Sequence, residues 1–366
     1  MHTIAQIPCG GPLDISELLD HSISFLSEST SDLKACALVA RSWVRPAQAY
    51  LFKAPKIMYS RDGTTPAVAW QRFYDAVHHS PHLLSYIRQL DLQVGDIYYE
   101  TCVKICDLPF SHLERVSISG WSSEVGQLLR LPTLRRLRIS SFWWGGPSRR
   151  AWEDCSLTIR HLELEFLPES STVPPPPPRA AHIQLHSLRL ESQGAAPYRL
   201  TQSLRGFDLS HLKALSIGRG VEVNWQEYGP VLRSIQSLDV TVEENQPLID
   251  FTAFPNLSLL RLAVLQPVPP MVYATLSTIA PSHPIHTITI VIVRTFLIEN
   301  LDVSGCKQLA IKLASLPMRS PLTVKFETHC PHAEASRTFA GLDLGDRHPL
   351  VSTVDDTWWE RVVSSS

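Results

Sequence analysis

A short apolar pattern recurs from residue 83 onward and constrains the fold more than any other feature of the sequence. In each copy an apolar residue is followed by a second one three or four positions later, and the copy closes on an apolar-x-apolar pair. The copies that run from Phe110 to Ile118 and from Leu131 to Ile139 are clear examples. Because side chains alternate across a strand, the closing pair predicts a short strand with both apolar side chains on one face.

The copies follow one another at nearly regular spacing. Their closing pairs recur at intervals of about 21–28 residues, close to the period of leucine-rich repeats. The residues between the pairs leave room for a helical or irregular return segment, and helices are predicted over 123–131 and 225–235. The predicted fold class is therefore α/β. The pairs begin at Leu90, Val116, Leu137, Leu162, Leu188, Leu215, Leu238, Leu260 and Ile288, with one more candidate at Val324.

The array resembles leucine-rich repeats of the irregular type, although the Asn or Cys that usually follows the strand is missing from most copies. The resemblance implies a solenoid with a parallel sheet on its concave face; an ordinary α/β domain with Leu-rich strands is the alternative. Residues that alternate with the closing pairs would then face outward, where mixed charge suits a protein target better than an apolar small molecule. A merely solvated sheet face is the other interpretation. The predicted target-binding residues are Arg115, Arg136, Arg138, His161, Glu163, Glu165, Arg189, Glu191, Asp239 and Arg261.

The N-terminal part has a helical pattern instead. Asp14 and Glu17 have capping-box spacing, and the apolar residues of 15–26 fall on one helical stripe. Two more short helices are predicted over 32–39 and 42–52. Three short helices bury little apolar area by themselves, so we expect this head to pack against a neighbour or a partner.

The head resembles an F-box. The run from Leu33 to Trp43, LKACALVARSW, is similar to the LxxCxLVxRxW core of many fungal F-box proteins, and residues 73–92 are similar to the segment that joins the F-box to the first repeat. The family usually carries Leu-Pro shortly before Glu17, where this sequence has Asp14 and Ile15. The resemblance implies that the head docks on a Skp-type adaptor through Leu18, Leu19, Ile23, Leu26, Leu33, Leu38, Val39 and Trp43.

Together the two resemblances imply the substrate-recognition subunit of a Skp-cullin-F-box type E3 ubiquitin ligase. Its expected partners are the Skp-type adaptor, a cullin scaffold reached through the adaptor, and an unidentified protein target bound by the repeats. The alternative is a non-ligase interaction scaffold with a degenerate F-box, which the departure at Asp14 and Ile15 favours. The predicted organisation is an F-box-like helical domain over 1–55, a connecting helical segment over 56–82, the irregular repeat array over 83–330 and a C-terminal tail over 331–366.

The tail contains two adjacent tryptophans, Trp358 and Trp359. Large aromatic side chains bury much apolar area, so we expect them to pack on the last repeat. A short docking peptide that includes Asp355, Asp356 and the tryptophans is the alternative.

No common catalytic motif is present: the sequence lacks GxxxxGK[ST], GxSxG, HExxH and CxxC. We therefore predict a binding protein that is not an enzyme and that uses no cofactor and no metal. Cys102 and Cys106 have helical spacing, and the run from His329 to His332 holds three potential ligands. Neither group has a second set of ligands nearby in the sequence, so neither is predicted to be a metal site.

Charge and cysteine content narrow the expected partners and location. The 33 basic and 35 acidic residues give a formal net charge of −2, so no global field favours nucleic acid or an anionic membrane. No apolar stretch approaches the roughly 18 residues that a membrane-spanning helix needs. The 7 cysteines are an odd number and are scattered, which is typical of reduced thiols. We expect a cytoplasmic or nuclear protein that binds neither nucleic acid nor membrane.

Overall fold

The computed structural model describes residues 16–55, 66–94, 99–140, 152, 154–166, 183–192, 198–199, 207–243, 247–265, 267–293, 303–316, 323–328, 350–353 and 357–365. The chain is mixed α/β and forms two compact units, Met1–Arg135 (unit 1) and Arg136–Ser366 (unit 2). Several residues singled out in the sequence lie outside the described part: Asp14, Ile15, His329, His332, Asp355 and Asp356.

Unit 1 begins with a small helical head. The two helices expected over 32–39 and 42–52 are present, each slightly longer than predicted. The hydroxyl of Ser29 caps the second helix by accepting a hydrogen bond from the Asp32 backbone N–H at 3.4 Å. The helices of the head are α1 (Ser16–Ser24), α2 (Thr30–Val39) and α3 (Arg41–Lys53).

The rest of unit 1 contains the first two repeat strands. They pair in parallel, with Leu90 opposite Val116 and Leu92 opposite Ile118, and all four side chains are buried. The Arg88 backbone N–H donates to the Lys53 carbonyl at 2.9 Å, which joins the head to the start of the first strand. The elements in chain order are α4 (Pro66–His79), η2 (Pro81–Tyr86), β1 (Gln89–Gln93), α5 (Tyr99–Cys106), β2 (Arg115–Ser119) and η4 (Glu124–Arg130).

Unit 2 is built on a parallel sheet. Its register aligns one apolar closing pair with the next, so that Leu188, Leu215, Leu238 and Leu260 lie opposite one another in successive strands. Two-residue strands β6 (Tyr198–Arg199) and β8 (Val221–Glu222) form a separate small pair. The order in the main sheet is β3 (Arg136–Ser140), β4 (His161–Phe166), β5 (Ser187–Ser192), β7 (Ala214–Ile217), β9 (Ser237–Val242), β10 (Leu259–Leu265), β11 (Thr287–Val293), β12 (Thr323–Thr328) and β13 (Leu350–Thr353).

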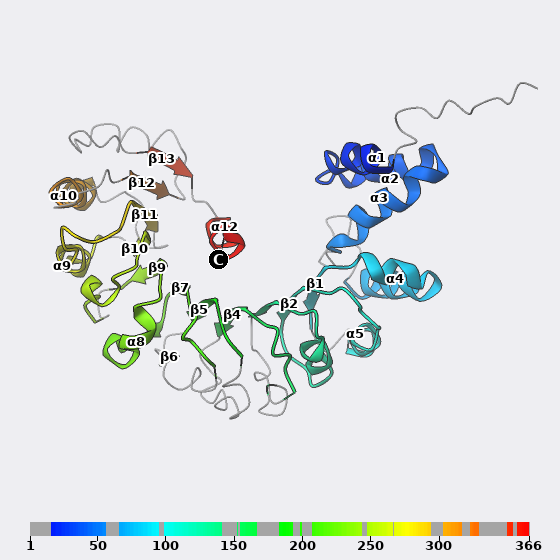
Figure 1. The fold of residues 1–366 in the computed structure, drawn as a ribbon, viewed down its shortest axis with the longest axis horizontal. Coiled ribbons are helices and arrows are strands. Elements are labelled where there is room, and N and C mark those ends of the chain that lie inside the picture. Colours follow the sequence, from blue (N-terminus) through cyan, green and yellow to red (C-terminus); the bar gives the residue numbers. More distant parts are fainter. Residues whose placement is uncertain are drawn as a thin grey trace, which may run out of the picture. The chain divides into compact units, whose positions relative to one another are not determined.

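The return segments of unit 2 lie on one side of its sheet and the last helix lies on the other. Helices α8, α9 and α10 cover one face, whereas α12 contacts the opposite face (Figure 1). Residues 331–366, which the sequence predicts as a C-terminal tail, form the strand β13 and the helix α12. Among the described residues, no helix has the length and apolarity needed to cross a membrane. The helical elements are η6 (Trp225–Tyr228), α8 (Gly229–Leu232), η7 (Phe251–Ala253), α9 (Pro270–Ser277), α10 (Val303–Ala314) and α12 (Trp358–Ser365).

The predicted strands are confirmed, including the candidate at Val324, and both members of each closing pair are buried. The two predicted return helices were wrong in type. The segment 123–131 is a 3-10 helix, and it contains Gly126, which is a poor α-helix former. The segment 225–235 divides at Tyr228 into η6 and the short α8, and Pro230 lies in the first turn of α8, where its missing backbone N–H breaks no helical hydrogen bond.

Candidate functional site

The sheet of unit 2 presents rows of side chains to the face that α12 contacts, which we term the α12 face, and two of these rows run the length of the sheet from β3 to β12. Apolar closing pairs point to the opposite face, so the residues that alternate with them point to this one. The first row consists of Arg136, His161, Ser187, Ala214, Ser237, Leu259, Thr287 and Thr323. The second row consists of Arg138, Glu163, Arg189, Ser216, Asp239, Arg261, Thr289 and Lys325.

Small side chains occupy the middle of the first row. Ser187, Ala214 and Ser237 stand side by side on successive strands, and all three are buried. A run of small residues lowers the surface of the sheet and lets another backbone approach closely. Sequence reasoning collected the charged residues of this face and missed these three. The available indication was that the position directly before the closing pair is Ser, Ala and Ser in three consecutive repeats.

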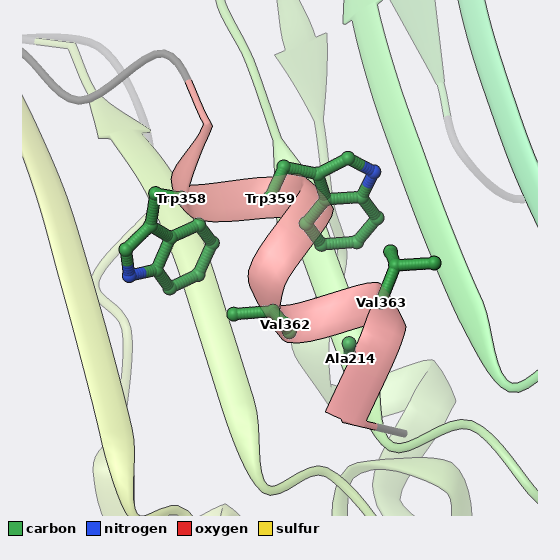
Figure 2. Close-up of a cluster of buried hydrophobic side chains, with 5 residues drawn as sticks. All are labelled: Ala214, Trp358, Trp359, Val362 and Val363. Carbon is green, nitrogen blue, oxygen red and sulfur yellow. The ribbon is translucent and has the colours of Figure 1, made fainter. Parts of the chain in front are cut away.

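Helix α12 packs its apolar side onto this low part of the sheet. Trp358, Trp359, Val362 and Val363 have the spacing of one helical face and form a buried cluster with Ala214 (Figure 2). Leu259 of β10 packs against the same cluster. The tryptophans therefore pack against the sheet as expected. They lie on β7 and near β10, in the middle of the sheet. The expectation that they pack on the last repeat was therefore wrong.

Two arginines that were predicted to bind a target contact α12 instead. Arg136 Nη1 forms an ion pair with Glu360 Oε2 at 3.2 Å, and its Nη2 donates to Ser364 Oγ at 3.4 Å. The Arg261 guanidinium lies over the Trp358 ring, 5.5 Å from the centroid, in a cation–π arrangement. The tail of the chain thus occupies the surface where the sequence predicted a protein target.

Arg261 also joins two carboxylates beneath the helix. Its Nη1 donates to Asp239 Oδ2 at 3.3 Å and its Nη2 to Glu327 Oε2 at 3.2 Å. Ser216 Oγ adds a hydrogen bond to Asp239 Oδ2 at 3.0 Å. Burial raises the pKa of the Asp239 carboxyl, and the Arg261 charge opposes this rise. The network holds the arginine in place as a platform for the Trp358 ring.

Two polar N–H groups at this contact are buried without an acceptor among the described residues. They are the indole Nε1 of Trp359, whose residue is 3% exposed, and Nε of Arg261. A buried unsatisfied donor costs about 1–3 kcal/mol, because it loses its water and gains nothing in exchange. The contact between α12 and the sheet is therefore extensive in apolar area but incomplete in hydrogen bonding.

A row of imidazoles lies beside the small residues. His161 Nδ1 is 2.8 Å from Ser187 Oγ, and the His186 ring lies between the rings of His161 and His211 at centroid distances of 6.4 and 6.5 Å. Burial, followed by the charge of Arg136, lowers the pKa of His161 to about 4. Burial also lowers the pKa of His186. In the described part of the chain no three His, Cys, Asp or Glu residues come together as a metal site.

The other predicted target residues pair largely with one another. Arg138 lies 3.7 Å from Glu165, and Arg189 lies 3.5 Å from Glu191 on its own strand. Glu163 is partly buried and stands between Arg138 and Arg189 in the second row. Each of these ion pairs joins charges of opposite sign, so the α12 face has little net charge over β3 to β5.

Arg115, the first of the predicted target residues, belongs to unit 1. It lies on β2 opposite Gln89 of β1, at a partly buried position that alternates with Val116. The remaining predicted target residues all belong to unit 2.

The predicted adaptor-binding residues of the head divide into two groups. Leu19, Ile23 and Leu33 form the buried core of the head, and Leu26 and Trp43 pack against it together with Tyr50 and Leu51. The second group is exposed. Phe25, which sequence reasoning missed, is exposed as well. The exposed apolar residues are Leu18, Phe25, Leu38 and Val39.

The cysteine pair is part of the core of unit 1. Cys102 and Cys106 lie on α5, and both are buried and free of disulfide bonds. A hydrogen bond with Cys102, together with burial, raises the pKa of Cys106. A thiol held protonated in this way is a poor nucleophile and a poor metal ligand.

Comparison with models of known protein families and with curated proteins gave no match for this chain.

Proposed function

We propose that this chain is the target-binding subunit of a Skp-cullin-F-box type ubiquitin ligase. Its helical head would dock on a Skp-type adaptor, and the α12 face of unit 2 would bind a protein target. The chain itself would carry out no bond chemistry. It would act by raising the local concentration of the target next to the conjugating enzyme that the cullin scaffold holds.

The observation that carries the proposal is the exposed apolar set on the head. Leu38 and Val39 at the end of α2 are 88% and 65% exposed, and Phe25 just after α1 is 75% exposed. So small a head needs most of its apolar residues for its core. Large apolar side chains that nevertheless stay exposed are typical of contact sites. Leu38 and Val39 belong to the run from Leu33 to Trp43 that resembles the F-box core.

The division of the adaptor-binding residues refines the proposal. Leu19, Ile23 and Leu33 would act indirectly, since they hold the helices of the head together. Leu18, Leu38 and Val39 would make the contact with the adaptor. A test of docking must therefore change the exposed group, because a charge placed at Leu19 would unfold the head.

The experiment is a quantitative binding assay between the full chain and a purified Skp-type adaptor. The test variant carries Leu38→Asp and Val39→Asp, and the matched control carries Leu157→Asp, which changes an apolar residue of unit 2 that is 54% exposed. We expect at least a tenfold loss of affinity for the test variant only, since a few apolar anchors carry most of the binding energy of an interface. Equal binding by both variants, or no binding by the unchanged chain, contradicts the proposal.

Co-purification with the cullin scaffold separates the two forms of the proposal. A ligase subunit brings both adaptor and cullin out of a lysate, and this recovery fails in the Leu38→Asp, Val39→Asp variant. Recovery of the adaptor alone supports the scaffold with a degenerate F-box.

A further inference from the structure

Helix α12 contacts the sheet in the manner of a bound peptide. Its apolar residues all lie on one side and are buried against β7 and β10, whereas Arg361 and Ser364 are exposed. It follows β13 after only residues 354–357 in the sequence. The helix is short, so its place on the sheet depends on these side-chain contacts rather than on its own helical stability.

The surface under α12 favours particular kinds of side chain in a bound helix. The small row at Ser187, Ala214 and Ser237 admits large side chains, and Figure 2 shows the two indole rings and the two valines gathered around Ala214. Arg136 at one end pairs with an acidic side chain, and Arg261 at the other carries an aromatic ring. Adjacent aromatics flanked by cations are the kind of anchors that dominate helix recognition by proteins.

The fit of α12 is also incomplete. Trp359 Nε1 and Arg261 Nε are buried without an acceptor among the described residues. Glu360 is only partly buried, so its ion pair with Arg136 is screened by water. A ligand that supplies an acceptor for Arg261 Nε would gain a contact that the tail lacks, and Trp359 Nε1 would regain water once the tail leaves. Both effects favour displacement of the tail.

We propose that the α12 face is a binding site for an amphipathic helix of a partner protein and that α12 is its built-in competitor. The partner helix would carry two adjacent large aromatic residues, an acidic residue directly after them and two β-branched residues one turn further on. This inference rests on the proposed function in one respect, that unit 2 binds a protein. It adds the class of ligand and the means of regulation, which is displacement of the tail.

The test uses a fluorescent peptide with the sequence of residues 355–366 as the probe and the full chain as the receptor. The open variant of the receptor carries Trp359→Asp and Val363→Asp, which remove the tail's own anchors. The control receptor carries Arg361→Asp, a change on the exposed side of the same helix. A tethered competitor acts at an effective concentration of roughly millimolar, so we expect the open variant to bind the probe about 10- to 100-fold more tightly than the unchanged and control chains.

A charge reversal then locates the bound peptide. Adding Arg136→Glu to the open variant should weaken probe binding at least tenfold, and a probe with Glu360→Arg should restore it. Both effects follow from the ion pair that Arg136 makes with Glu360 in the intact chain. Loss without restoration would mean that the peptide binds elsewhere, which overturns the proposal.

Two further results decide the question. A folded open variant, shown by a cooperative melt, that does not bind the probe overturns the proposal. If the open variant does not fold, hydrogen exchange of the unchanged chain decides instead: amides of α12 that exchange at least tenfold faster than those of β9 to β11 support a displaceable helix, and equal protection overturns it. None of these readings involves the adaptor, so they fail or succeed independently of the adaptor-binding assay.

Discussion

Replacement of Arg261 by methionine tests how the α12 face is held together. The substitution keeps a long apolar stem but removes the guanidinium, and Asp239 and Glu327 are left as buried carboxylates with side chains only 11% and 4% exposed. Removing one partner of a buried ion pair costs about 3–5 kcal/mol, because the other charge stays buried and uncompensated. Loss of the cation–π contact with Trp358 adds about 0.5–2 kcal/mol.

The pH dependence of this loss follows from the Asp239 pKa. Burial already raises this pKa above the ordinary value of 3.8, so the native state binds the proton more tightly than the unfolded state. Stability therefore falls as the pH rises from 3.8 through the raised pKa. Arg261 opposes the rise. Without Arg261 the pKa of Asp239 is higher still, so the pH range over which stability falls extends upward. The deficit of Arg261→Met relative to the unchanged chain should therefore be largest near neutral pH and should shrink toward pH 5.

Urea unfolding followed by far-UV circular dichroism at neutral pH and at pH 5 measures both quantities. The control is Arg219→Met, which removes an arginine from a more exposed ion pair with Glu243 at 3.6 Å. Such surface pairs contribute about 0–1 kcal/mol. If Arg261→Met costs no more than Arg219→Met, or if its deficit is the same at both pH values, the buried network does not stabilise this face.

Two other predictions concern local features. Gly120 has a φ of +87°, and a Cβ there would lie 2.5 Å from the Val94 carbonyl oxygen, so Gly120→Ala should destabilise unit 1 by about 1–3 kcal/mol in a thermal melt; an unchanged melting temperature would refute the turn geometry. His161 has its pKa lowered to about 4, so it stays neutral in the native state while the unfolded state takes up a proton below its ordinary value of 6.5. Stability should fall as pH falls from 6.5 toward 4, by about 1–2 kcal/mol after allowance for partial exposure, and His161→Gln should remove that part of the slope.

The strands were predictable because their defining feature is local. A pair such as Leu188 and Leu190 places two apolar side chains on one face, and burial of that face fixes both the strand and its register. The return segments were less predictable. Gly126 and Pro230 shift the balance between α and 3-10 geometry by amounts that depend on packing as much as on propensity.

The site was only partly predictable, for a different physical reason. Alternation identified the residues that face away from the core, and Arg136 and Arg261 are among them. It carried no information on what they contact, because the partner of Arg136 is Glu360, more than two hundred positions away in the sequence. The small residues Ser187 and Ala214 were missed since a lone Ser or Ala indicates nothing until a register places them side by side.

The two candidate surfaces differ in a way that bears on how each would work. On the head, apolar side chains such as Leu38 and Phe25 are exposed, and burial by a partner would be the gain on binding. On the α12 face the situation is reversed: polar side chains such as Ser187 and Asp239 are already buried, and Trp359 covers part of the surface. A ligand for the head only has to bind, whereas a ligand for the α12 face must also outcompete a tethered helix. Affinity at the second surface would therefore be set by the difference between two similar contacts, which is the condition under which a small change in either helix has a large effect on occupancy.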